Sequence, residues 1–335
     1  MNHVERFRAV MSFQPVDRLP RIEWATWWDK TIARWKTEGL PQHLKDTFDI
    51  HHYLGLDPYR QFWFSPRAGT LPPPGGHGLS VVSNMDEYQA ALPHLYPPPG
   101  PILEAMRPWA AQQDRGEAVL WITLDGFFWF PRTMLGIEQH LYAFYDQPEL
   151  MHRMNQDLLK YNLSILNGMA RFCRPTFATI AEDMSYNHGP MLSKALFDAL
   201  LAPYYRQLTP ALKEMGVRII VDSDGDVTDL MPWLLEVGVE GILPLERQAG
   251  VDAGKLRQLH PGMLMIGHYD KMVMTRGKAA MRQEFQRLLP VMKSGGFICS
   301  VDHQTPPGVS LEEYRVYLGL LEEFAAAAGG FDRKE

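Results

Sequence analysis

The segment VRIIVDSDGD, residues 217–226, joins a short apolar run to a cluster of acidic residues. Its apolar residues are nearly continuous rather than alternating, which is typical of a strand buried on both faces of a parallel sheet. Gly225 then allows the backbone to turn sharply. The segment therefore predicts a buried parallel strand whose carboxyl end carries Asp222 and Asp224.

The same pattern, a short apolar run that ends in a polar residue, occurs along the whole chain. The predicted strands are 19–24, 59–64, 118–125, 176–183, 217–224, 240–246, 262–268 and 296–303. Longer stretches with amphipathic helical periodicity lie between them, over residues 148–172, 193–214, 228–237, 253–259, 276–294 and 310–327. Strands alternating with helices predict an α/β fold, a (β/α)8 TIM barrel in a single domain over residues 1–335. A doubly wound open sheet is the alternative.

Three segments fall outside this repeat. Residues 1–13 have apolar side chains at helical spacing and predict an N-terminal helical extension, which Pro15 ends. The segments LPPPGGHG (71–78) and PPPGP (97–101) are rich in Pro and Gly. We expect both to be long loops, either surface connections or a lid over the barrel mouth.

The composition excludes several classes of function. Hydrophobic residues make up 46% of the chain and charged residues 21%, and the net charge of -6 argues against a nucleic acid or an acidic membrane as partner. Two cysteines and the lack of a signal-like or long apolar segment lead us to expect a cytoplasmic protein without a membrane span. No GxGxxG, P-loop, GxSxG or HExxH motif is present, so nucleotide-dependent and serine-hydrolase chemistry are not expected.

Polar residues at the predicted strand ends indicate where the chemistry lies, because barrel enzymes place catalytic groups at the carboxyl ends of strands. These residues are Glu23, Asp125, Glu182, Asp183, Asp222, Asp224, Glu246, His268, Asp302 and His303. So many carboxylates in one mouth would repel each other or take up protons, and a divalent cation relieves both problems. We therefore hypothesise a metal site.

Asp222 and Asp224 are the first candidate ligands, because alternation along a strand points both side chains to the same side. The alternative is a turn that caps the next helix, for which Asp226 or Thr228 is enough. His303 ends the last strand and is either a third ligand or a hydrogen-bonded structural residue.

Glu246 and His268 end neighbouring strands and are the alternative metal ligands. Their other interpretation is a Glu–His hydrogen bond that orients the imidazole ring. In both cases they contribute to the same end of the barrel.

Aromatic residues gather at or just after strand ends in the first half, as WATWW (24–28), QFWF (61–64) and FFWF (127–130). They either pack in the core or form the walls of a pocket for a flat, apolar substrate. An arginine close by would neutralise a substrate carboxylate. The candidate substrate-binding residues are Trp24, Trp28, Trp63, Phe128, Trp129 and Arg132.

Three motifs resemble one known superfamily. They are ERFRAVMSFQPVDRLP (5–20), EDMSYNHGPMLSKALFDALLAPYY (182–205) and SVDHQTPPGVSLEEY (300–314). They are similar to the N-terminal helix and turn, the mid-chain signature and the C-terminal strand and helix of the uroporphyrinogen decarboxylase superfamily. The resemblance covers nearly the whole chain and implies a barrel enzyme.

Within that superfamily the chain looks closer to the cobalamin-linked methyltransferases than to the decarboxylases. The decarboxylases carry an RQAGR segment that grips substrate carboxylates, where this chain has WATWWDKTIARW (24–35), and a His-Ser-Lys-Gly run where it has Asp222-Ser-Asp-Gly. The methyltransferases hold zinc at positions that match Asp222, Asp224 and His303. The resemblance therefore implies a divalent metal, zinc first, with oxygen and imidazole ligands in place of thiolates.

The activity implied is an O-demethylase type of methyl transfer, from a small methoxylated aromatic to cobalamin on a separate corrinoid protein, with the metal activating the substrate oxygen. Asp125, Glu182 and Asp183 are the expected catalytic carboxylates. One alternative is a metal-free decarboxylase in which Asp183 or Asp125 stabilises a protonated intermediate. The other is a non-catalytic corrinoid- or tetrapyrrole-binding protein, and the oligomeric state stays open in each case.

Overall fold

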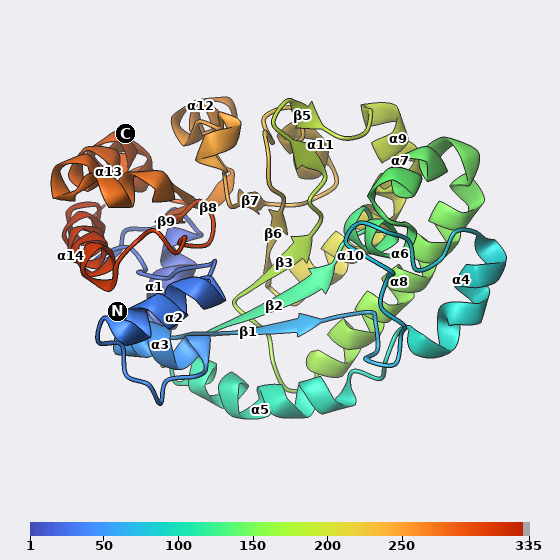
Figure 1. The fold of residues 1–335 in the computed structure, drawn as a ribbon, viewed down its shortest axis with the longest axis horizontal. Helices are drawn as coiled ribbons and strands as arrows, with labels where there is room; N and C mark the ends of the chain where they lie inside the picture. The colour runs from blue at the N-terminus through green and yellow to red at the C-terminus, as the bar shows by residue number, and fades with distance from the viewer. Residues whose placement is uncertain (331–335) are drawn as a thin grey trace.

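A parallel β-sheet forms the centre of the computed structural model, which describes residues 1–330 (Figure 1). The strands lie side by side in chain order and every neighbouring pair is parallel. They are β1 (Tyr59–Phe64), β2 (Val119–Asp125), β3 (Phe177–Ala181), β6 (Arg218–Asp222), β7 (Gly241–Leu243), β8 (Leu264–Tyr269) and β9 (Phe297–Val301). A small hairpin, β4 (Ser185–Tyr186) with β5 (Gly189–Pro190), follows β3. The α/β class and the parallel sheet are as predicted.

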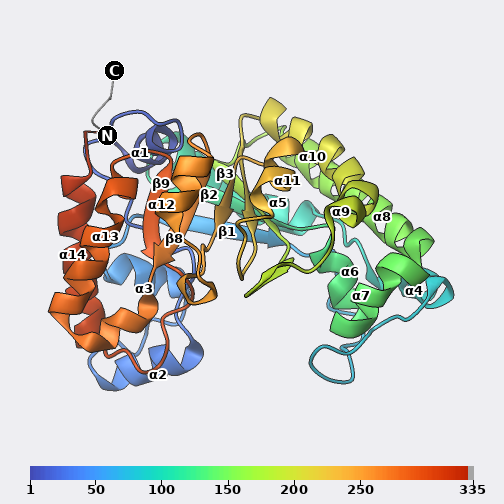
Figure 2. The ribbon, with the colours of Figure 1, turned by 90° about the horizontal axis from the view of Figure 1, so that it is seen from above.

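Helices connect successive strands and flank the curled sheet, with α13 and α14 on one side and α8 and α10 on the other (Figure 2). The early helices are α1 (His3–Val10), α2 (Asp29–Thr37), α3 (Thr47–Tyr53), α4 (Met85–Ala91) and α5 (Gly100–Asp114). Those of the middle are α6 (Trp129–Leu135), α7 (Ile137–Asp146), α8 (Pro148–Met169), α9 (Lys194–Leu200) and α10 (Ala202–Glu214). The last are α11 (Met231–Glu236), α12 (Ala253–Leu259), α13 (Lys278–Met292) and α14 (Leu311–Ala327), and short 3-10 turns lie at Leu92–His94, Arg247–Ala249 and Lys271–Arg276.

The prediction of a strand at residues 19–24 is wrong, and with it the eighth strand of a closed barrel. Pro20 has no N–H to give to a ladder, and Glu23 contacts the neighbouring strand with its side chain. Its carboxylate accepts hydrogen bonds from Ser300 Oγ at 2.7 Å and Val301 N at 3.1 Å, while its backbone carbonyl accepts one from Tyr59 Oη at 2.8 Å. This segment therefore bridges β9 and β1 through side chains, and the sheet within residues 1–330 is an incomplete barrel of seven strands.

Helix α1 covers the N-terminal ends of the strands, which confirms the predicted helical extension. Its N-terminus carries a capping box between Asn2 and Glu5. Phe7 is fully buried and its ring stacks on Phe177 of β3 with centroids 4.8 Å apart, and Val10 O accepts a hydrogen bond from Gly296 N just before β9. With the bottom closed in this way, the other end of the sheet is left to form a site.

The two Pro/Gly-rich segments differ in structure. Residues 71–78 contain no helix or strand, as expected of a loop. The expectation of a long loop at 97–101 is wrong, because α5 already begins at Gly100. In the described part of the chain, no helix combines the length and the apolarity that crossing a bilayer requires.

Candidate functional site

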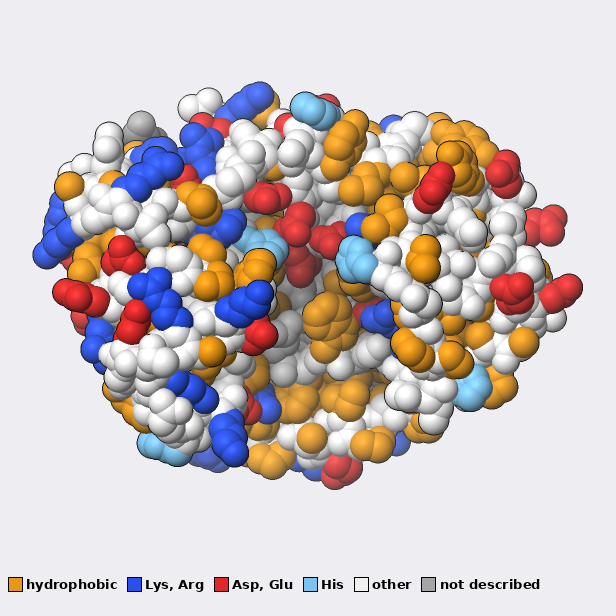
Figure 3. Space-filling model, viewed as in Figure 1, with side chains coloured by type: hydrophobic (Ala, Val, Ile, Leu, Met, Phe, Trp, Pro, Cys, Tyr) orange, Lys and Arg blue, Asp and Glu red, His pale blue; other side chains and the backbone are white. Residues whose placement is uncertain are grey.

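A cavity of about 390 Å³ opens at the carboxyl ends of β1, β3 and β6. Figure 3 shows a hollow in the middle of this face, with acidic side chains gathered along one part and hydrophobic ones along another. This is the end of the sheet at which barrel enzymes hold their catalytic groups. The residues that line the cavity are Trp24, Ala25, Thr26, Gln61, Trp63, Trp121, Trp129, Ala181, Glu182, Asp183, Asp222, Asp224, His303 and Gln304.

Three aspartates and one histidine meet on the acidic wall. Asp222 ends β6, Asp183 follows β3, and His303 follows β9. His303 Nε2 lies 3.7 Å from Asp224 Oδ2. The structure thus brings together Asp222, Asp224 and His303, which the sequence predicted as metal ligands, and Asp183, which it predicted as a catalytic carboxylate.

Burial and mutual repulsion shift the pKa values of this wall. Desolvation raises the pKa of Asp222 well above its usual range, and the neighbouring charges of Asp183 and Asp224 raise it further. Burial, followed by the charge of Asp224, also raises the pKa of Asp183. The pKa of His303 is raised by its interaction with Asp224. The wall therefore attracts positive charge.

The turn after β6 shows how the sequence builds this wall. Asp226 Oδ1 accepts hydrogen bonds from Thr228 N at 3.0 Å and Thr228 Oγ1 at 2.6 Å and so closes a local turn. The prediction that Asp226 or Thr228 caps the next helix is wrong, because α11 begins after Leu230 and has no side-chain cap. Gly225 has φ +82°, and a Cβ there would lie 2.7 Å from the Tyr186 backbone. The side chains of Asp222 and Asp224 take no part in this turn and line the cavity.

Glu246 and His268 do not line the cavity. Glu246 Oε2 accepts a hydrogen bond from Gly225 N at 3.0 Å and so supports the turn from behind. His268 is buried, with Nδ1 2.8 Å from Leu245 O and Nε2 3.2 Å from Ala253 N. Burial lowers the pKa of His268 to about 4. Protein atoms occupy both ring nitrogens, and the structure does not bring this residue to the acidic wall.

The donor chemistry of the wall suits a hard or borderline cation. As these side chains lie, however, no three His, Cys, Asp or Glu residues within 1–330 are grouped so that they could hold a metal ion. The predicted ligands therefore share one wall of the cavity without forming a coordination group in this arrangement.

Glu182 holds the loop that carries the next part of the cavity. Its buried carboxylate accepts hydrogen bonds from the backbone N–H groups of Phe127 at 2.9 Å, Phe128 at 2.7 Å and Trp129 at 3.0 Å, and from the Tyr205 hydroxyl. Burial raises the pKa of Glu182 to about 7 although these donors oppose the shift. With both oxygens engaged, Glu182 is suited to positioning the loop.

Asp125 lies behind the cavity wall rather than in it. Its Oδ1 accepts a hydrogen bond from Trp63 Nε1 at 2.7 Å, and its Oδ2 is buried without a partner within residues 1–330. Burial raises the pKa of Asp125 to about 6. The carboxylate is therefore placed to orient the Trp63 ring.

The predicted aromatic residues divide into two groups. Trp24, Trp63 and Trp129 line the cavity, whereas Trp28 is 44% exposed outside it and Phe128 is buried against His140 with ring centroids 4.5 Å apart. The structure adds Trp121, which the sequence-based prediction missed. A signal was available, because Trp121 lies two and four residues before Thr123 and Asp125 on the same side of the strand.

Arg132 lies outside the cavity lining. Its Nη1 donates a hydrogen bond to Asp183 O at 2.8 Å, and its guanidinium carbon lies 5.5 Å from the Trp129 ring centroid. The Arg132 side chain therefore connects Asp183 with Trp129 from outside the cavity and does not line it.

The chain is similar in sequence to one protein family and in fold to several solved structures. The family described as uroporphyrinogen decarboxylase (URO-D) matches residues 102–324, more than half of the chain. No curated protein matches the sequence. Among solved structures, a methyltransferase from Methanosarcina mazei is 15% identical with a TM-score of 0.66, over 97% of this chain and 99% of that one.

Two glycosidase structures resemble the chain less closely. An endo-glycoceramidase II from Rhodococcus sp. is 12% identical with a TM-score of 0.43, over 91% of this chain and 80% of that one. A β-L-arabinopyranosidase from Geobacillus stearothermophilus is 10% identical with a TM-score of 0.41, over 96% and 78%. Both overlaps are too loose to inform the chemistry of the site.

Proposed function

The chain belongs to the uroporphyrinogen decarboxylase family, and we propose that it is a methyltransferase. In this proposal it binds a small methylated substrate in the tryptophan-lined cavity and passes the methyl group to the cobalt of a corrinoid carried by a separate protein. The fold shared with a methyltransferase from Methanosarcina mazei supports the class of reaction. A methoxylated aromatic is the donor from which the sequence-based hypothesis starts.

The observation that carries the proposal is the cavity itself, in which indole rings and ionisable side chains meet at the carboxyl ends of the strands. The indoles would hold the donor and keep water away from the methyl group. Asp183, Asp222, Asp224 and His303 would set the charge around the leaving atom. Glu182 and Asp125 act through the walls, because one holds the loop of Trp129 and the other the ring of Trp63.

Methyl transfer requires that the bond between the methyl carbon and its heteroatom breaks with the electron pair staying on the heteroatom. The reduced, Co(I) corrinoid supplies the pair for the new bond to carbon and is a second substrate in this scheme. The chain's own contribution is to orient the donor and to exclude water.

The test is to incubate the purified protein with cob(I)alamin and a panel of methylated donors, methoxylated aromatics among them, and to follow methylcobalamin by absorbance. We expect transfer with at least one donor and its loss in a Trp63→Ala/Trp129→Ala variant. A panel without any transfer, in folded protein, would count against the proposal.

The divalent cation, with zinc as first candidate, stays a separate hypothesis that no step of the proposed reaction requires. Metal analysis of the wild type beside Asp222→Ala and Asp224→Ala decides it. One equivalent of metal that both variants lose would establish the site, and a wild type free of metal but active would refute it.

A metal-free decarboxylase is the second candidate, and the raised pKa values of Asp183 and Asp222 favour it because such groups hold protons readily. It ranks lower because a substrate with many carboxylates would meet an acidic wall. Turnover of uroporphyrinogen would establish it in place of methyl transfer.

A further inference from the structure

We propose that the methyl donor of this site is an organic cation, a methylated ammonium compound. This inference rests on the proposed methyl transfer and narrows its substrate class. It follows from what the cavity offers to a ligand, namely aromatic surface and carboxylates.

The first observation is that most of the indole N–H groups in the lining already donate hydrogen bonds to the protein. Trp24 Nε1 donates to Val301 O at 2.7 Å, Trp63 Nε1 to Asp125 Oδ1 at 2.7 Å, and Trp121 Nε1 to Thr179 Oγ1 at 2.8 Å. Three of the four tryptophans in the lining have therefore given their N–H to the protein. What they can still offer a ligand is π surface, which attracts cations through the ring quadrupole.

The second observation is the sign of the charge. The lining contains the carboxylates of Glu182, Asp183, Asp222 and Asp224, and no Lys or Arg. No hydrogen bond to the Asp222 carboxylate is found within residues 1–330, and the residue lines the cavity. His303 is the one ionisable base of the lining, and it already lies beside Asp224.

The nearest cationic side chains are directed elsewhere. Arg132 donates to the Asp183 carbonyl oxygen from behind the Trp129 ring, and Lys271 pairs with the buried Asp302 at 3.1 Å. Neither of these two side chains hydrogen-bonds a carboxylate of the lining, so the Asp222 carboxylate is left open to a cationic ligand. An anionic donor would be repelled, and a neutral methoxy compound would leave the carboxylates uncompensated.

The third step is chemical. In a quaternary ammonium the nitrogen carries a positive charge, so when the C–N bond breaks the electron pair stays on nitrogen and the leaving group is a neutral tertiary amine. The methyl carbon takes its new bonding pair from Co(I), which becomes a methylated Co(III). Charge and electrons balance with the corrinoid as the sole co-reactant. No proton is needed at the leaving atom, unlike for a methoxy donor.

The binding test compares choline with 3,3-dimethylbutanol, which has the same shape without the charge, by calorimetric titration of the whole chain. We expect choline to bind at least about tenfold more tightly, and Asp224→Asn to remove most of that difference without changing the neutral alcohol. Asp146→Asn, which removes an exposed carboxylate at the end of α7, is the matched control and should bind as the wild type. Equal affinity for the two probes, or an Asp224→Asn variant that still prefers choline, overturns the inference.

Methyl transfer to cob(I)alamin is measured separately, with tetramethylammonium, choline and a methoxybenzoate as donors. Transfer from an ammonium donor supports the inference. Transfer from the methoxybenzoate alone overturns the substrate class and leaves the methyltransferase standing. Selective choline binding without transfer from any donor supports cation recognition and refutes the methyltransferase.

Discussion

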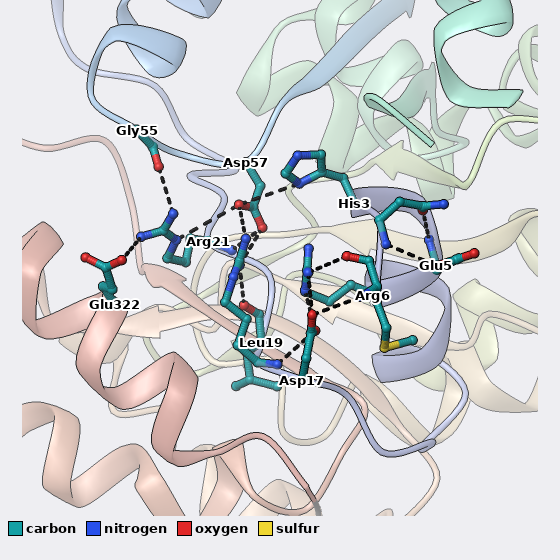
Figure 4. A network of polar contacts seen from close by, with 12 residues as sticks. His3, Glu5, Arg6, Asp17, Leu19, Arg21, Gly55, Asp57 and Glu322 are labelled. Carbon is teal, nitrogen blue, oxygen red and sulfur yellow. Dashed lines mark hydrogen bonds and ion pairs between the residues drawn. The ribbon is translucent and has the colours of Figure 1, made fainter. Parts of the chain in front are cut away.

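At the amino end of the strands Asp57 accepts two hydrogen bonds from the Arg18 guanidinium, at 2.8 and 2.7 Å, whereas at the carboxyl end no hydrogen bond reaches the carboxylate of Asp222 within residues 1–330. Figure 4 shows the first environment, in which Asp57 and Asp17 lie among His3, Arg6 and Arg21. Hydrogen bonds from the Arg6 guanidinium hold the pKa of Asp17 below its usual range. Hydrogen bonds from Arg18, with His3 Nδ1 3.7 Å away, likewise lower the pKa of Asp57 although its burial opposes the shift. The pKa of Asp222 is displaced in the opposite direction.

The two ends therefore use one residue type for two purposes. Paired carboxylates fasten α1 and the segment before β1 to the barrel bottom, where nothing has to bind. Carboxylates crowded together at the mouth cost stability, and such unfavourable arrangements persist at sites that need them for function. Substitutions at the amino ends of the strands should lower the unfolding free energy, and some substitutions at the carboxyl ends should raise it.

The largest effect is expected at the bottom. Arg18→Ala removes the main partner of Asp57, whose side chain is only 5% exposed, and we expect a loss of about 3 kcal/mol of unfolding free energy, since breaking a buried pair leaves a charge uncompensated. Urea and thermal unfolding midpoints measure it. Arg115→Ala, which breaks the exposed pair with Glu117, is the control and should leave the midpoints nearly unchanged.

The pH dependence of the unfolding free energy of Arg18→Ala tests whether the lost charge pair causes the destabilisation. Because the pKa of Asp57 is lowered in the folded state, its stabilisation is complete above its ordinary pKa and is lost as pH falls through the folded value. The gap between the wild type and Arg18→Ala should therefore narrow below about pH 4. A gap that stays constant down to acid unfolding would mean that packing, not charge, is lost.

The next largest loss of unfolding free energy is expected from a substitution beside Glu182, which holds the Trp129 loop. A Cβ at residue 126 would overlap the Glu182 carboxyl group, so Gly126→Ala should displace that side chain from the three N–H groups it accepts from. We expect a loss of about 2 kcal/mol, typical of overpacking, together with weaker ligand binding as the Trp129 loop shifts. Gly262→Ala, where the added carbon meets nothing within 4 Å, is the control. Unchanged stability and binding in Gly126→Ala would show that Glu182 does not position the loop.

The sequence predicted the residues at the carboxyl ends of the strands better than it predicted the contact between β9 and β1. Periodicity places Asp222, Asp224 and His303 at the carboxyl ends of β6 and β9, and the curl expected of a barrel brings these two strands, which are not paired with each other, to one cavity. The closure between β9 and β1 depends on Glu23, a buried side chain whose pKa is raised to about 7 by burial and which receives hydrogen bonds from Tyr317 and Ser300. No local pattern reports such a long-range contact.

The backbone φ angles at the strand ends could not be predicted from the sequence either. His268 has φ +71°, which turns its ring toward Leu245 and Ala253 instead of the hollow. Asp183 has φ +47° and lines the cavity. Both residues follow apolar runs of the same kind, and only tertiary packing decides which of them faces the site.

A third change should raise stability. Asp222→Asn removes one of the crowded carboxylates while keeping its shape, and we expect a gain of about 1 kcal/mol at pH 8, with methyl transfer lost. Since the folded pKa of Asp222 is raised, the wild type loses stability as pH rises from the ordinary pKa of Asp toward the folded value, and the variant does not. The gain should therefore shrink toward pH 4 in thermal unfolding scans. A variant less stable than the wild type at pH 8 would refute the account of the mouth as a strained site.

The smallest effect concerns the pair that partly relieves the mouth. His303 and Asp224 are 35% and 39% exposed at 3.7 Å, so their interaction should contribute less than about 1 kcal/mol. Because the pKa of His303 is raised, this contribution is present below the ordinary histidine pKa and is lost as pH rises through the folded value. Asp224→Asn should lower the His303 pKa in an NMR titration, and Glu246→Gln should lower it less, since Glu246 acts only through its charge at longer range. Equal shifts in the two variants would mean that the surrounding carboxylates together, including Glu246 outside the cavity lining, rather than Asp224 alone, attract the proton. The mouth would then share its charge among several carboxylates, whereas at the bottom Asp17 and Asp57 each lie 2.7 Å from an arginine that pairs with them.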